Sequence, residues 1–147
     1  MKKIKLKVIT PERLVLEEIV DQVSLPTVLG EITVLPDHIP LIANLASGDI
    51  VAVSGGESIP MAVAGGFVEI KKDKEGITTV AILADFAEHM VELSDEAVEK
   101  ARTRAEELKK NTDKSDSVDF EHFSAELERS LTRVKVADKW RKKKYRK

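Results

Sequence analysis

The spacing of the apolar residues changes once along the chain, near residue 90. Before that point, short segments rich in β-branched residues, such as Ile4–Ile9 and Ile77–Leu83, are separated by glycine and proline, as is typical of strands. After it, Ser94–Lys110 contains neither glycine nor proline, and apolar residues recur at steps of three and four, at Val98, Ala101, Ala105 and Leu108. That spacing predicts an amphipathic helix. We therefore expect an α+β chain, with strands first and helices second.

The strand-forming part, residues 1–88, predicts an N-terminal β-sandwich or flattened barrel of about ten short strands. Its breaks fall at regular intervals, for example at Pro26, Pro36 and Gly55. The pair Gly65-Gly66 interrupts a segment of strand character, which indicates a bulge or a close approach of two backbones. A phosphate-binding role for this pair is disfavoured, because a strand rather than a helix follows it.

Residues 89–147 predict a C-terminal antiparallel hairpin of two helices. Ser94 has the chemistry of an N-cap for the first helix, and a polar loop over residues 111–117 precedes a second helix that begins near Asp119. The apolar stripe of the second helix comprises Phe120, Phe123, Leu127, Leu131 and Val134. The first stripe is half alanine, which buries little apolar area, while ordering each residue costs about 1–2 kcal/mol. We expect a marginally held hairpin that is suited to detaching.

The composition excludes several kinds of chemistry. There is no cysteine, so disulfides, thiolate metal sites and cysteine nucleophiles are ruled out. His38, His89 and His122 are far apart and lack ligand spacing, so no metal site is expected. No serine lies in a nucleophile-elbow context, and neither a catalytic set nor a cofactor site is recognisable. No apolar run reaches membrane-spanning length and the N-terminus lacks a signal-peptide pattern, so we expect membrane association only through a partner.

Charge is distributed unevenly along the chain. Residues 1–90 carry 8 basic against 13 acidic residues, whereas residues 91–147 carry 16 against 13. The basic end includes Arg129, Arg133, Lys135 and Lys139, followed by Trp140 and a basic tail over residues 141–147. One interpretation is a solvated tail that complements a helix C-terminus, and another is a surface that docks on an acidic partner, with Trp140 filling an apolar notch. Nucleic-acid binding through Trp140 and Tyr145 is a third, which the acidic strand region without an aromatic platform disfavours.

Three phrases in the strand region carry a more specific signal. They are Gly-Glu-Ile-Thr-Val-Leu-Pro-Asp-His-Ile-Pro-Leu at residues 30–41, Ala-Gly-Gly-Phe-Val-Glu-Ile at 64–70 and Val-Ala-Ile-Leu-Ala-Asp-Phe-Ala-Glu at 80–88. In order and spacing they resemble the epsilon subunit of F-type ATP synthases, and Val-Asp-Phe at 118–120 and Ser-Ala-Glu-Leu at 124–127 are similar to that family's second helix. The resemblance covers essentially the whole chain and implies the same sandwich and hairpin.

The resemblance also implies a function and partners. The sandwich would bind the gamma subunit and the ring of c subunits in the central rotor, and would help couple proton (or sodium) flow to ATP synthesis. The hairpin would lie on the sandwich, or extend along gamma between the alpha and beta subunits and block ATP hydrolysis. The chain would be a regulatory and coupling subunit without catalytic residues or a cofactor, peripheral on the cytoplasmic face of a bacterial plasma membrane.

Two sets of residues follow from the resemblance. The first, expected to meet the c ring and gamma, comprises Leu29, Gly30, Glu31, Asp37 and His38. The alternative for this set is structural, with the glycine shaping a turn and His38 capping a loop. The second set, expected to dock on the alpha and beta subunits in the inhibitory state, comprises Arg129, Arg133, Lys135, Lys139 and Trp140.

The chain departs from the family at the start of its first helix. Many bacterial epsilon subunits carry Ile/Leu-Asp-x-x-Arg-Ala there, and in some of them this motif helps to bind ATP. Here Ser94, Ala97 and Val98 replace the aspartate, arginine and alanine, so a donor fork for phosphate is missing. Glu88 and Arg104 remain at neighbouring family positions. We therefore expect no direct ATP sensing.

Overall fold

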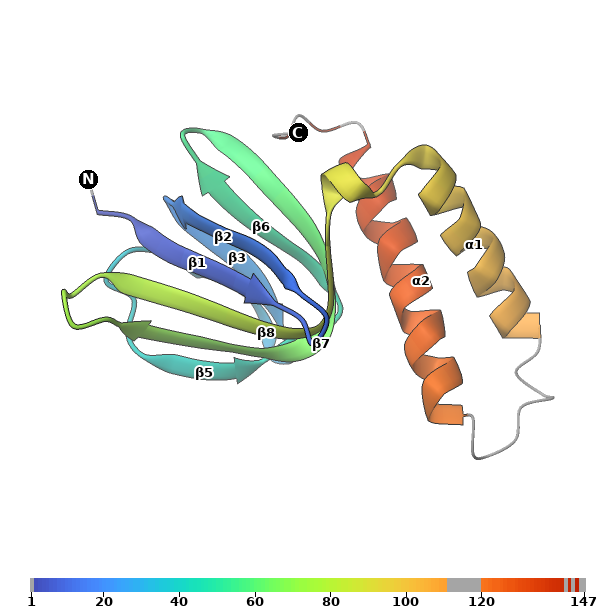
Figure 1. Cartoon of the computed structure of the whole chain (residues 1–147), viewed down its shortest axis with the longest axis horizontal. Coiled ribbons are helices and arrows are strands. Elements are labelled where there is room, and N and C mark those ends of the chain that lie inside the picture. Colours follow the sequence, from blue (N-terminus) through green and yellow to red (C-terminus); the bar gives the residue numbers. More distant parts are fainter. Residues whose placement is uncertain (1, 111–119, 142, 144, 146–147) are drawn as a thin grey trace.

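The strands and helices follow the predicted order. The computed structural model describes residues 2–110, 120–141, 143 and 145, and places the helices beside one end of the strand region (Figure 1). The elements are β1 (Ile4–Ile9), β2 (Leu14–Val20), β3 (Gln22–Thr27), β4 (Gly30–Val34), β5 (Leu41–Asn44), β6 (Gly48–Ser54), β7 (Glu57–Lys72), β8 (Thr78–His89), the 3-10 turn η1 (Met90–Glu92), α1 (Asp95–Lys110) and α2 (Phe120–Trp140).

The sandwich is built from one hydrogen-bonded path that folds over itself. The strand order is β2-β1-β8-β7-β6-β3-β4, with β5 also paired to β7. The first half of β7 pairs with β6 and its second half with β5, while β8 follows β7 along most of its length. The two long strands therefore belong to both layers. Alternate residues of the strands, such as Ile4, Leu6 and Val8 of β1, point into the core between the layers.

The described residues form eight strands rather than about ten, in part because β7 is a single strand. The sequence suggested two segments, separated at Gly65-Gly66. Instead both glycines stay within β7 at positive φ, 74° and 116°, at the point where its partner changes from β6 to β5. A Cβ on Gly66 would lie 2.2 Å from the carbonyl oxygen of Leu83. The prediction of a close backbone approach is confirmed.

The first helix agrees with its predicted pattern. Val98, Ala101, Ala105 and Leu108 are its buried residues. The Ser94 hydroxyl accepts a hydrogen bond from the Ala97 amide at 3.1 Å, which is the geometry of an N-cap.

The predicted stripe of the second helix was incomplete. Its members Phe123, Leu127, Leu131 and Val134 are only half-buried. Because α2 lies between α1 and the sandwich (Figure 1), it also buries residues outside this stripe. The buried residues of α2 cluster toward its C-terminal end and comprise Ser130, Thr132, Val136, Ala137 and Trp140. Asp119, the loop over residues 111–117 and the side chain of Phe120 lie outside the described residues.

The close approach at Gly66 provides a test of the fold. We expect Gly66→Ala to lower the free energy of unfolding by about 3 kcal/mol or more, because a clash with Leu83 is added to the strain of a positive φ. Gly76→Ala is the matched control, since Gly76 also has a positive φ but nothing within 4 Å of the added Cβ; it should cost about 1 kcal/mol. Urea denaturation of both variants measures the difference. Equal losses would contradict the role of the close approach.

Candidate functional site

The cationic face of α2 meets acidic and aromatic side chains of the sandwich. Two contacts, about two turns apart on the helix, attach α2 to β6 and β8. We call this set the clasp; it comprises Asp49, Phe86 and Glu88 from the sandwich and Arg133, Lys139 and Trp140 from α2.

The first contact is centred on the Asp49 carboxylate of β6. One of its oxygens accepts hydrogen bonds from Lys139 Nζ and from Trp140 Nε1, both at 2.8 Å. The Asp49 side chain is 12% exposed, and Trp140 is 6% exposed. Burial raises the pKa of Asp49, but the hydrogen bonds from Lys139 and Trp140 and the charge of Lys139 outweigh it, so the pKa lies below its usual value. The carboxylate therefore stays ionised at neutral pH and binds both donors.

The second contact is a bidentate ion pair. Arg133 Nε and Nη2 donate to the two oxygens of Glu88 on β8, at 3.0 and 2.6 Å. The same guanidinium lies 4.7 Å from the centre of the Phe86 ring, and that of Arg129 lies 5.7 Å from it. Planar guanidinium groups favour such combined pairing and stacking. The geometry fixes the rotation of α2 relative to the sandwich.

A third contact holds the segment that connects the sandwich to α1. Arg13, in the turn between β1 and β2, donates two hydrogen bonds of 2.8 Å to Glu92 of η1. The hydrogen bonds and charge of Arg13 hold the pKa of Glu92 below its usual value, against a smaller effect of burial. Glu92 also accepts a hydrogen bond from the His89 amide. The chain is therefore tied to the sandwich by side-chain contacts as far as Glu92, and a pivot for the helices would lie at Leu93 and Ser94, between η1 and α1.

The apolar surface beneath the clasp has fewer buried residues than the core of the sandwich. Its buried residues are Ala62, Ala64, Phe86, Met90, Leu93, Val98, Val136, Ala137 and Trp140. Three of these are alanine, whereas the core between the sandwich layers is formed mainly by Val, Ile and Leu. Since apolar burial scales with the area removed from water, the hairpin is held less firmly than the strands are held to each other.

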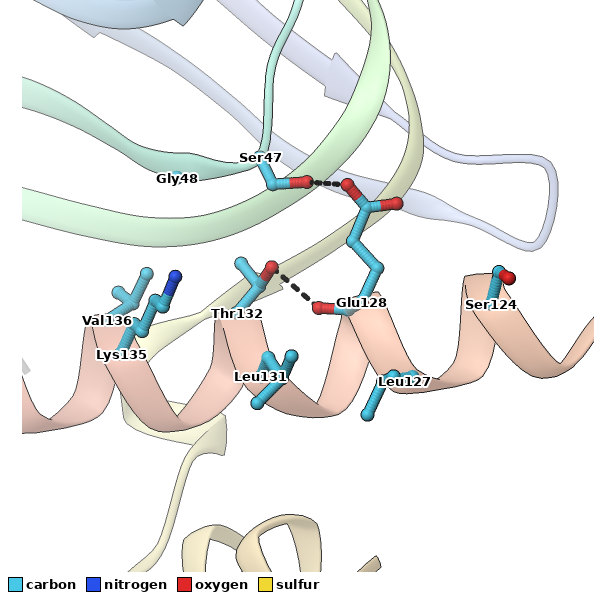
Figure 2. A pocket seen from close by; sticks show the side chains of 9 residues that line it. All are labelled: Ser47, Gly48, Ser124, Leu127, Glu128, Leu131, Thr132, Lys135 and Val136. Carbon is cyan, nitrogen blue, oxygen red and sulfur yellow. Dashed lines mark hydrogen bonds between the residues drawn. The ribbon is translucent and has the colours of Figure 1, made fainter. Parts of the chain in front are cut away.

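An open groove runs along the other side of α2. Figure 2 shows Ser47 donating a hydrogen bond to the Glu128 carboxylate across it, while Thr132 donates to the carbonyl oxygen of Glu128 within the helix. Lys135 is exposed and lines this groove. Across this groove, the hydrogen bond between the Ser47 and Glu128 side chains links α2 to the residue that precedes β6.

The predicted inhibitory set is therefore largely engaged within the chain. Arg133, Lys139 and Trp140 belong to the clasp and Arg129 stacks against Phe86, whereas Lys135 faces solvent. The sequence did not indicate that the sandwich itself supplies their partners, because Asp49 looked like any acidic residue in a strand. The tail residues 142, 144, 146 and 147 lie outside the described residues.

The predicted c-ring and gamma set is divided by the fold. Leu29, Gly30 and Glu31 lie at the β3–β4 turn, where Leu29 is 97% exposed. Asp37 and His38 follow the opposite end of β4. There Asp37 accepts from Lys2 at 2.5 Å and Lys72 lies 3.0 Å from it, and hydrogen bonds from both lysines lower the pKa of Asp37. The two groups are therefore not one patch, and Asp37 contributes to the structure of the far end of the sandwich.

A row of apolar residues on the outer face, four of them exposed and one (Ile9) half-buried, was not identified from the sequence. The row crosses four neighbouring strands. Phe67 of β7 pairs with Leu83 of β8. Leu83 pairs with Ile9 of β1, and Ile9 pairs with Leu14 of β2. Ile42 is close by on β5 and is 70% exposed. We call these five residues the outer apolar row. Its signal was present in the adjacent apolar pairs of the strands, such as Phe67-Val68 and Ile82-Leu83, because one member of each pair must face away from the core.

Sequence comparison places this chain in a known family. The family model described as the ATP synthase delta/epsilon chain beta-sandwich domain matches residues 3–90. The ATP synthase epsilon chain of Herpetosiphon aurantiacus is 38% identical over 91% of this chain and 93% of its own length. That of Dehalococcoides mccartyi is 37% identical over 97% of both chains. The chain belongs to the ATP synthase epsilon family.

Solved structures agree on the fold. A chain of the Euglena gracilis mitochondrial ATP synthase, from a structure that contains OSCP, F1 and the c-ring, superposes with a TM-score of 0.67. It is 24% identical and covers 90% of this chain and 79% of that one. This chain therefore shares its fold with a chain of that assembly.

A cavity between the helices and the sandwich is lined by Glu88 and Arg104, the two residues that lie at family positions near the ATP-binding motif. Its lining also includes Arg13, Glu92, Ala97, Arg129 and Arg133. Three of its guanidiniums are paired with carboxylates, since Arg13 donates to Glu92, Arg104 to Glu126 at 2.6 Å and Arg133 to Glu88, whereas that of Arg129 lies against the Phe86 ring. Among the described residues, no group of three or more acidic or histidine side chains is placed to hold a metal ion, and no helix there is long and apolar enough to cross a membrane.

This cavity leads to a prediction about nucleotide. We expect isothermal titration of the chain with ATP to give no saturable heat, because Ala97 leaves no guanidinium at the family position and Arg13, Arg104 and Arg133 are paired with carboxylates. Ala97→Arg is the informative variant, since it restores the missing donor fork and should gain weak binding. Saturable binding by the unmodified chain would contradict the prediction.

Proposed function

We propose that this chain is a non-catalytic central-stalk subunit of an F-type ATP synthase that helps couple ion flow to ATP synthesis and restrains ATP hydrolysis through its helices. The observation that carries the proposal is the match to ATP synthase epsilon chains over nearly the full length of both chains. In this arrangement residues 1–88 anchor the chain to the rotor and residues 89–147 regulate. As part of the complex, the chain would be peripheral on the cytoplasmic face of a bacterial plasma membrane.

The outer apolar row supports anchoring to the gamma subunit. Phe67, Leu83 and Leu14 are each more than two-fifths exposed, although they lie side by side across neighbouring strands. A contiguous exposed apolar surface of this kind marks a protein interface. The β3–β4 turn, with Leu29, Gly30 and Glu31, is the candidate contact with the c ring.

The composition of the clasp supports regulation. Arg133, Lys139 and Trp140 are held by carboxylates, and an acidic surface on the alpha or beta subunits would offer the same chemistry. Fewer buried apolar residues lie beneath α2 than in the core of the sandwich, so releasing the helices should cost less free energy than unfolding the sandwich. The pivot at Leu93 and Ser94 leaves the sandwich and its outer face unchanged when the helices move.

Reconstitution tests the regulatory part. Added to a purified alpha-beta-gamma complex, the full chain should bind gamma and reduce ATP hydrolysis, whereas the chain truncated after Lys110 should bind equally well and inhibit much less, because it lacks α2. Steady-state hydrolysis and copurification with gamma are the measurements. Full inhibition by the truncated chain would remove α2 from the mechanism, and failure of the full chain to bind gamma would reject the proposal.

A charge in the outer apolar row tests the anchoring part. We expect Phe67→Glu to weaken binding to gamma by roughly tenfold or more, since truncating or charging a central apolar contact typically has that effect. Ile19→Glu is the matched control: Ile19 is 51% exposed on the same outer face, but lies beside Lys5 at the other end of β2. Surface plasmon resonance on immobilised gamma compares them. Equal affinities would locate the gamma contact elsewhere.

A further inference from the structure

The Asp49 carboxylate and its two donors form an unusual junction. A single oxygen binds an ammonium and an indole N–H that come from consecutive residues of α2. Trp140 is the only tryptophan in the chain and its ring is almost entirely covered. Lys143 lies 5.1 Å from the centre of that ring, and the Tyr145 ring meets it edge-on at 6.3 Å.

This arrangement makes two states of the helix mutually exclusive. The indole N–H is a single donor, so Trp140 cannot donate to an external carboxylate while Asp49 accepts from it. Lys139 has three donors, but its position is set by the same contact. Building on the proposed function, we infer that Asp49 acts as an internal substitute for the acidic partner of α2, and that competition between Asp49 and that partner sets the proportion of chains with released helices.

The neighbouring charges support this specific role for Asp49. Asp138, next to Lys139 in sequence, faces α1 and accepts from Arg102 at 3.2 Å. Arg104 and Glu126 likewise connect α1 to α2. These pairs join the two helices to each other and not to the sandwich. Among the described residues, Asp49 and Glu88 are the sandwich carboxylates whose contacts with α2 must break on release. Of the two, Asp49 accepts the hydrogen bond from Trp140.

The sole tryptophan allows a direct test on the full chain. We expect Asp49→Asn to shift Trp140 emission to longer wavelength and to increase its quenching by acrylamide, with the released population rising roughly tenfold, as loss of a charge-assisted hydrogen bond implies. Asp138→Asn is the control, because it makes the same change of charge one residue from Lys139 without touching the sandwich contact; its emission should match that of the unmodified chain. Equal emission in all three proteins would overturn the inference.

A second variant keeps the test decisive if Asp49→Asn fails to fold. Lys139 is on the helix surface, so Lys139→Gln removes the ammonium from the contact without entering the sandwich. Its circular dichroism should be unchanged and its Trp140 emission should shift in the same direction as that of Asp49→Asn. An unshifted emission from a folded Lys139→Gln chain would also overturn the inference.

Inhibition of the alpha-beta-gamma complex tests the competition itself. Since the internal competitor is removed, Asp49→Asn should reach half-maximal inhibition at a roughly tenfold lower concentration than the unmodified chain or Asp138→Asn. Release of Trp140 without stronger inhibition would overturn the competition. If the unmodified chain does not affect hydrolysis at all, the proposed function fails, whereas the fluorescence comparison still decides whether Asp49 holds the helix.

Discussion

The attachment of α2 to the sandwich depends on two carboxylates, Asp49 and Glu88. Each binds cationic or N–H donors from one face of the helix, and the apolar surface beneath them is rich in alanine. Each of these contacts contributes on the order of 1 kcal/mol, because desolvation and side-chain ordering offset part of the attraction. They also provide direction, since α2 must present Arg133 and Trp140 on the same side. The junction therefore specifies one resting position without making it permanent.

The strand region does not share this dependence. Its core lies between two layers that are joined by β7 and β8, and the close approach at Gly66 allows β7 to change partners without a break. Because η1 is tied back by Arg13, a movement of the helices begins beyond Glu92. The outer apolar row lies on strands whose positions do not require the hairpin. Anchoring and regulation can therefore use the same chain without disturbing each other.

Several features were predictable because they depend on neighbours in sequence. The change of period near residue 90, the Ser94 cap, the buried face of α1 and the backbone approach at Gly65-Gly66 were all confirmed. The single stripe assigned to the second helix was incomplete, since a helix with partners on two sides buries more than one stripe. The outer apolar row was missed, although adjacent apolar residues in the strands carried its signal. Leu29, Gly30 and Glu31 lie at one end of β4 and Asp37 and His38 follow its other end, and contact of either group with the c ring or gamma stays a prediction.

By itself the sequence determined which segments form strands or helices, where the first helix starts, and which family the characteristic phrases resemble, because periodicity, capping and positive φ are local properties. Only the tertiary structure decided that the basic face of α2 already has partners. Asp49 and Trp140 are 91 residues apart in the chain, and Glu88 and Arg133 are 45 apart. A carboxylate in a strand has no local feature that specifies its distant donor, so the pairing arises only when the sandwich and the helices are packed together.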